Sequence, residues 1–177
     1  MKHQSRLNQI VRAQRGFSLI EVLIACVVLA IGLLGLAGLQ VTGMRNNQTA
    51  YLRSQAIQSA YDIADRMRAN QPGVSAGRYN NQAATTDDCD DATDDGNVGV
   101  TCSVSQLAGF DLAQWAADLT ARLPSGAGTV CIDSTPDDGT SAAPACDGLG
   151  AAYAVKIWWD EDRQGAANQR FVTSFQP

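Results

Sequence analysis

Histidine is almost absent from this sequence. The single histidine is His3, so the chain after position 16 has none for a metal site or a catalytic triad. There is also no C-x-x-C spacing, the usual signature of a structural zinc site. The aspartates are scattered, and no serine or cysteine stands in a recognisable nucleophile motif. These absences argue against an enzyme, a bound metal and a cofactor.

Acidic residues are missing from the first 16 positions, which carry Lys2, Arg6, Arg12 and Arg15. The rest of the chain has nine basic and 18 acidic side chains, a net side-chain charge of −9. A basic segment in front of an apolar run favours retention of that segment in the cytoplasm and export of the residues after the run. The acidic charge of the exported part argues against nucleic-acid binding, which needs a basic surface.

The apolar run extends from Phe17 to Leu39, and Glu21 is its only charge. Roughly 20 apolar residues span a bilayer core, so the run is long enough to cross a membrane. A cleaved signal peptide would have a shorter apolar region and a small-residue cleavage site after it. A lipoprotein box at Leu23–Cys26 would need its apolar core in front of the cysteine. A plain membrane anchor leaves Gly16 and Glu21 unexplained.

The residues GFSLIEVLIA, from Gly16 onward, resemble the processing site of type IV prepilins and pseudopilins. The resemblance implies that a prepilin peptidase cuts between Gly16 and Phe17 and methylates the new N-terminus at Phe17. It also gives Glu21 an assembly role, in which the carboxylate meets the N-terminal amino group of its own or a neighbouring subunit. Opposite charges attract strongly in a low-dielectric setting, which supports this role.

The stretches IGLLGLAGLQ and MRNNQTAYLRSQAIQSAYDIADRMRAN resemble the minor pilins of the PilV type, continuously from about Arg15 to Asn70. This resemblance implies a protein of the inner membrane, single-pass, with a periplasmic C-terminal domain, that later enters a type IV pilus at the cell surface. Its implied partners are other minor and major pilins. Two alternatives stay open: a minor pseudopilin of type II secretion, and a tip adhesin that uses an exposed aromatic such as Trp158.

We expect an α+β, type IV pilin-like fold, in which a long N-terminal helix packs on a small head with an antiparallel sheet. Apolar residues at spacings of three and four predict one helix from Phe17 to Ala69, about 80 Å long at 1.5 Å per residue. Asn70-Gln71-Pro72-Gly73 is a stop signal. The expected parts are a leader (1–16), a membrane-spanning half-helix (17–39), an amphipathic half-helix (40–70) and a periplasmic head (71–177).

Within the head, a helix is expected from Asp111, as N-cap, to Leu123. Before it, residues 72–103 have the composition of a loop. Alternation and turn residues predict three strands, with a polar connection between the last two. The acidic Asp160-Glu161-Asp162 tip is expected to be a solvated turn. The predicted strands are Thr129–Asp133, Ala152–Trp159 and Arg170–Phe175.

Four of the five cysteines, Cys89, Cys102, Cys131 and Cys146, lie in the exported part. An even set in an exported domain indicates two disulfides, for which three pairings exist, and a periplasmic setting. We favour pairing of neighbours, Cys89–Cys102 and Cys131–Cys146. The aspartates around Cys89 allow a calcium loop, but the closing glutamate is missing, so a solvated acidic loop is favoured.

Overall fold

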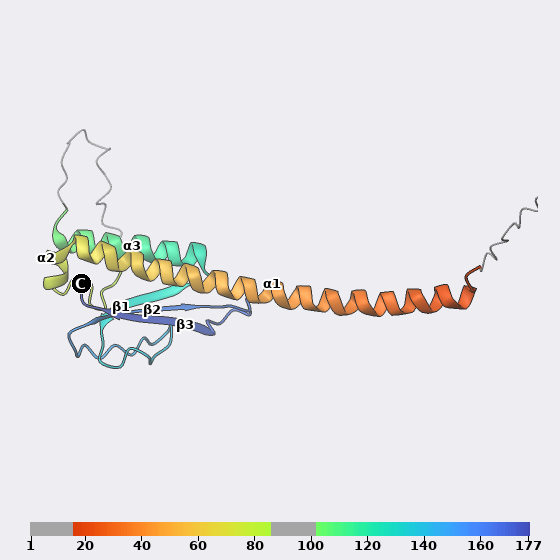
Figure 1. The fold of residues 1–177 in the computed structure, drawn as a ribbon. Helices are drawn as coiled ribbons and strands as arrows, with labels where there is room; N and C mark the ends of the chain where they lie inside the picture. Colours follow the sequence, from red (N-terminus) through yellow and green to blue (C-terminus); the bar gives the residue numbers. More distant parts are fainter. Residues whose placement is uncertain (1–15, 86–101) are drawn as a thin grey trace, which may run out of the picture. The chain divides into compact units, whose positions relative to one another are not determined.

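A computed structural model of the chain describes residues 16–85 and 102–177. Contacts divide the chain into two units, residues 1–45 and 46–177, and each is considered by itself. The elements of the structure (Figure 1) are α1 (Leu19–Ala69), α2 (Gln71–Ser75), α3 (Val104–Arg122), β1 (Ala127–Ile132), β2 (Tyr153–Trp159) and β3 (Gln169–Phe175).

The three strands form one antiparallel sheet in the order β1-β2-β3. Val155 at the centre of β2 pairs with Val130 of β1 and with Thr173 of β3. The C-terminal part of α1 and α3 lie side by side over one face of this sheet (Figure 1). The predicted α+β architecture, a long N-terminal helix on a small domain with an antiparallel sheet, is therefore confirmed.

The core lies between the two helices and the sheet. On α1 the buried side chains recur every three or four residues, which places them on one face of the helix. Trp115 of α3 fills the centre of the core, and its indole Nε1 donates to the backbone oxygen of Ser59 at 2.9 Å. The large side chains of the core are Leu52, Ile63, Met67, Tyr79, Leu112, Trp115, Leu119, Leu123, Val130, Tyr153, Val155, Ile157 and Trp159.

The start of α3 differs from the prediction. Asp111 is not its N-cap, because the helix begins at Val104 and Asp111 is buried within it. The cap is Ser103, whose Oγ accepts from the Gln106 backbone N–H, while the Gln106 side chain accepts from the Ser103 N–H. This capping box satisfies two backbone donors at the helix start.

The end of α1 is where the sequence predicts it, but the chain does not continue directly into a loop. Asn70 caps a second, short helix, α2, and its side chain accepts from the Gly73 N–H at 3.2 Å. Pro72 sits in the first turn of α2, where its missing N–H costs no hydrogen bond.

The strand β2 is buried on both faces rather than on one. Trp158 is only 4% exposed, so the expectation of an exposed aromatic there is wrong. Asp160, at the end of the strand, is 1% exposed, so it does not belong to a solvated turn. Trp158 is buried because β2 is the central strand and the segment between β1 and β2 covers its second face (Figure 1). Asp160 is held at the end of α3, where its N–H donates to the Pro124 carbonyl at 2.8 Å.

Candidate functional site

The region predicted for processing lies at the start of α1. Gly16 to Ser18 precede the helix, and the Ser18 carbonyl accepts from the backbone N–H groups of Glu21 (3.0 Å) and Val22 (3.3 Å). Phe17 is 86% exposed. A Cβ added at Gly16 would meet nothing within 4 Å, and Gly16 has no positive φ. Nothing in the described part of the chain therefore requires glycine at position 16.

Glu21 lies in the first turn of α1, one helical turn after Phe17. A carboxylate is favourable there, because the helix N-terminus carries partial positive charge and unpaired N–H groups. The side chain is exposed within the chain. Glu21 is thus free to meet a positive group, such as an amino group created between Gly16 and Phe17.

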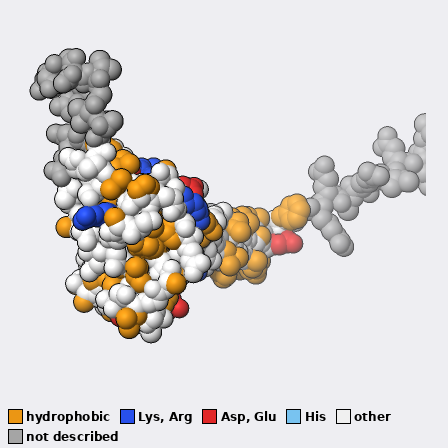
Figure 2. Space-filling view, turned by 90° about the vertical axis from the view of Figure 1, so that its left-hand side faces the viewer, with side chains coloured by type: hydrophobic (Ala, Val, Ile, Leu, Met, Phe, Trp, Pro, Cys, Tyr) orange, Lys and Arg blue, Asp and Glu red, His pale blue; other side chains and the backbone are white. Residues whose placement is uncertain are grey.

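The helix beyond Glu21 is covered with exposed apolar side chains (Figure 2). It contains an 18-residue window that is apolar enough to cross a membrane, and none of that window is buried. Large apolar side chains exposed in such numbers along one helix mark a surface for lipid or for other proteins. They are Leu19, Ile20, Val22, Leu23, Ile24, Val27, Val28, Leu29, Ile31, Leu33, Leu34, Leu36, Leu39, Val41 and Met44.

Two family matches cover this region and the part of the chain after it. Residues 11–37, which include Gly16, Phe17 and Glu21, match the prokaryotic N-terminal methylation motif. Residues 38–113 match the family of type IV pilin Tt1218, described as Tt1218-like. Together they support a type IV pilin. No curated protein and no solved structure matches the chain.

For a pilin, these matches suggest processing by a prepilin peptidase and other pilins as partners. The apolar helix and the methylation motif fit membrane anchoring and a place in a pilus. The remaining features of interest lie in the head, residues 71–177, where the sequence predicts two disulfides.

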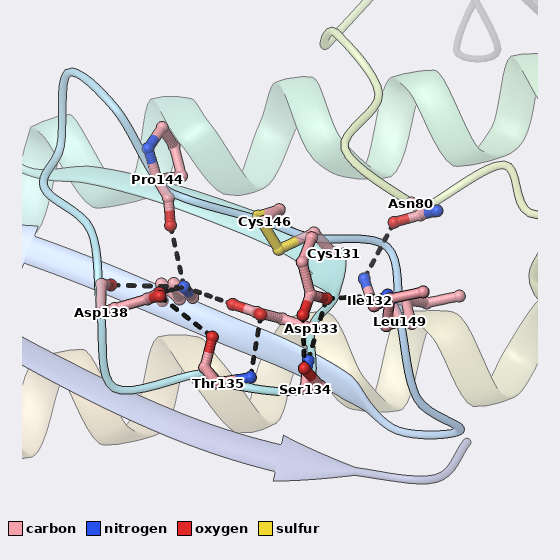
Figure 3. Close-up of a disulfide and its surroundings, with 12 residues drawn as sticks. Asn80, Cys131, Ile132, Asp133, Ser134, Thr135, Asp138, Pro144, Cys146 and Leu149 are labelled. Carbon is pink, nitrogen blue, oxygen red and sulfur yellow. Dashed lines mark hydrogen bonds and ion pairs between the residues drawn. A yellow bond between two sulfur atoms is a disulfide. The ribbon is translucent and has the colours of Figure 1, made fainter.

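Cys131 of β1 and Cys146 form a disulfide (Figure 3). This is the pairing of neighbours that the sequence favours. It closes the segment 132–145, which joins β1 to β2, against the end of β1. Cys89 and the aspartates around it lie outside the described residues. The Cys89–Cys102 disulfide therefore stays a prediction, as does the choice between a solvated acidic loop and a calcium loop around Cys89. Cys26 is a free, exposed cysteine of α1.

Lys156 is not singled out by the sequence, yet it is fully buried on the second face of β2. Its Nζ lies 2.5 Å from Asp133 Oδ2 and 2.9 Å from Asp138 Oδ1, and it donates to the Pro144 carbonyl at 2.8 Å. All three partners belong to the segment that the disulfide closes (Figure 3). Burial alone would lower the pKa of Lys156, but the two carboxylates outweigh it and raise the pKa.

Arg170 of β3 binds the same segment from the neighbouring strand. Its guanidinium donates to the carbonyls of Gly139, at 3.2 Å, and of Asp137. Lysine from β2, arginine from β3 and the disulfide from β1 therefore hold the 133–147 segment across the sheet. We call this segment the covering loop.

Ligand atoms of Cys131, Asp133 and Cys146 lie within 4.8 Å of one another, as in a metal site. Both sulfurs, however, are joined in the disulfide, so neither is a thiolate ligand. Asp133 is already the partner of Lys156. These three residues therefore attach the covering loop to the sheet and do not form a metal site.

A second buried polar group connects the end of α1 to the interior of α3. The Tyr79 hydroxyl donates to Asp111 Oδ2 at 2.6 Å and accepts from Asn70 Nδ2 at 3.1 Å. Arg66 approaches the other oxygen of Asp111 at 3.7 Å. Burial and the bond to Asp111 raise the pKa of Tyr79 strongly. These contacts fix the head to the end of the long helix and explain why Asp111 is buried.

Proposed function

We propose that this chain is a minor pilin of the PilV type. It would be made as a precursor, cut between Gly16 and Phe17 by prepilin peptidase, and methylated at Phe17. It would stand in the inner membrane as a single-pass protein with a periplasmic C-terminal head. From there it would enter a type IV pilus, or prime its assembly with other minor and major pilins, in support of twitching motility and adhesion.

The observation that carries this proposal is the start of α1. A glycine that the fold does not need precedes an exposed Phe17, an exposed carboxylate one turn later and an unburied apolar helix. A cut at Gly16 would leave that helix on the mature protein. The proposed role is structural rather than enzymatic, because it depends on packing and charge pairing alone.

Two substitutions separate processing from assembly. Gly16→Ala is expected to leave the precursor uncut, because the peptidase must fit the residue before the scissile bond. Glu21→Gln is expected to be cut normally but to be at least tenfold depleted from sheared pili, because the amino group of Phe17, once buried in the assembled fibre, would lack a partner. Intact-mass analysis of the membrane fraction reports cutting, and immunoblots of sheared pili report assembly.

Strains with and without the prepilin peptidase provide the control. A mature chain that begins at N-methyl-Phe17 only in the strain with the peptidase supports the proposal. An intact leader in both strains would refute it, and the roles of Gly16 and Glu21 would be lost together. Copurification with type II secretion components rather than with pilins would favour a pseudopilin instead.

A further inference from the structure

The loop between β2 and β3, residues 160–168, has an unexplained sequence pattern. Asp160-Glu161-Asp162-Arg163-Gln164-Gly165 follows the first half of a calcium loop, in which positions 1, 3 and 5 carry oxygen ligands and position 6 is glycine. Gly165 has a φ of 101°, the left-handed region that favours glycine. Glycine is thus required at this position of the turn.

Hydrogen bonds turn both carboxylates toward the loop backbone. Asp160 Oδ2 accepts from the Gly165 N–H at 2.5 Å, and Asp162 Oδ1 accepts from the Gln164 N–H at 3.2 Å. The base of the loop is closed by the Asn168 N–H, which donates to the Trp159 carbonyl at 3.0 Å. These bonds by themselves are ordinary for an acidic turn.

The independent observation is the second oxygen of Asp160. Asp160 is 1% exposed, and its Oδ1 is buried without a hydrogen-bond partner. In residues 16–85 and 102–177, no lysine or arginine forms an ion pair with Asp160. A buried carboxylate oxygen without a protein donor is unfavourable and calls for an explanation.

Asp160 lies two residues from a second carboxylate, that of Asp162. A buried carboxylate with one oxygen unpartnered, beside a second carboxylate, is an environment that a cation would stabilise.

We propose that the 160–168 loop binds a calcium ion. The pattern assigns as ligands the carboxylates of Asp160 and Asp162, the side-chain oxygen of Gln164 and the backbone carbonyl of Ala166. A flexible loop of oxygen ligands suits calcium better than magnesium, which demands a near-ideal octahedron. Unlike the assembly role of Glu21, this proposal does not depend on the chain being a pilin.

The pattern also sets the expected affinity. The twelfth position, which in a complete loop holds a bidentate glutamate, is Phe171 of β3. With two carboxylates and no closing glutamate, the site belongs with the weak extracellular class, with a Kd on the order of 10⁻⁴–10⁻³ M. That range suits a protein exposed to the outside medium.

The test is a calcium titration of the full chain in mild detergent, followed by calorimetry and by tryptophan fluorescence. Trp159 is next to Asp160 and gives a local signal. We expect one saturable site in the stated range and at least tenfold weaker binding of magnesium. Asp162→Asn should weaken calcium binding at least tenfold and leave the circular dichroism spectrum unchanged.

Glu161→Gln is the matched control, because it removes the same charge from the same loop at a position that is not a ligand. It should bind calcium as the unaltered chain does. Three outcomes would overturn the proposal: no saturable binding up to about 10 mM, ten times the weakest Kd expected; equal loss in both variants; or binding that survives Asp162→Asn and disappears with Asp95→Asn, which would place the ion in the 87–95 segment.

Discussion

Tyr79 shows how a single polar residue joins elements that are far apart in the sequence. Its ring belongs to the core, while its hydroxyl is held between Asn70, at the end of α1, and Asp111, inside α3. A buried polar group is tolerated when its hydrogen bonds are made. If one of the two bonded groups is removed, the remaining group is left buried without a hydrogen bond. The hydroxyl therefore specifies where α3 docks on α1.

The raised pKa of Tyr79 predicts an alkaline loss of stability. Its ordinary value is 10.0, and the folded value is higher, so the folded state keeps the proton where the unfolded state loses it. The stabilisation is complete below pH 10 and is lost as the pH rises toward the folded pKa. Urea unfolding of the full chain between pH 7 and 11 should show this fall, and Tyr79→Phe should make it shallower.

At pH 7, Tyr79→Phe should cost about 1–2 kcal/mol, because Asp111 loses its buried donor. Tyr61→Phe is the control, since Tyr61 is 63% exposed on α1 and should change neither the stability nor its dependence on pH. An alkaline profile that is the same in Tyr79→Phe and in the unaltered chain would contradict the assignment. Lys156 and Tyr153, whose pKa values are also raised, would then account for the fall.

At the scale of elements, the covering loop is the feature that makes β2 a fully buried strand. It has no helix or strand of its own, so its position depends on the disulfide, on Lys156 and on Arg170. Of these, Lys156 contacts the loop at Asp133, at Asp138 and at the Pro144 carbonyl. The loop is therefore fastened near its start, middle and end.

Lys156→Met is expected to lower the free energy of unfolding by about 3 kcal/mol, because it leaves the Asp133 carboxylate buried without its cation. Arg170→Met should cost less than about 1 kcal/mol, since Arg170 is exposed and binds only backbone carbonyls. Urea unfolding followed by tryptophan fluorescence measures both. Equal costs for the two variants would mean that the loop is held mainly by the disulfide.

Much of this arrangement could be predicted from the sequence, because it depends on local periodicity. The apolar stripe of α1 and the alternation in the strands placed those elements to within a few residues. The start of α3 was missed because its capping box, Ser103-x-x-Gln106, lies in a segment of loop-like composition. The burial of Lys156 could not be predicted, because its partners are brought to it by the tertiary fold.

Some residues of the candidate sites could likewise be predicted from the sequence, and others could not. Gly16, Phe17 and Glu21 could be found in the sequence because their register along the chain is the signal itself. The sequence predicts a solvated turn at Asp160-Glu161-Asp162 because a run of acidic side chains is usually exposed. In the structure, the Asp160 N–H donates to the Pro124 carbonyl at 2.8 Å. This contact, which the local sequence does not reveal, holds Asp160 against the end of α3.

At the scale of the whole molecule, the apolar residues fall into two sets along the chain. All core residues lie at position 52 or later, within the unit 46–177. The exposed row of large apolar residues lies between Phe17 and Met44, in the unit 1–45. The stability of the fold thus depends on residues after position 45, and the poor solubility of the chain depends on residues before it. Removing the first stretch should therefore leave a soluble, folded second stretch.

A chain that begins at Asn46 is therefore expected to fold without detergent. Its thermal midpoint should lie within about 5 °C of the full chain, a shift equivalent to about 1 kcal/mol for a domain of this size. Size exclusion and circular dichroism without detergent would measure this. As the control, a chain that begins at Ala60 loses Leu52 and Ala56 from the core and should melt at a clearly lower temperature. Aggregation of the longer fragment would mean that residues 17–45 contribute to the fold of the head, and the anchor could not then be treated as a separate unit.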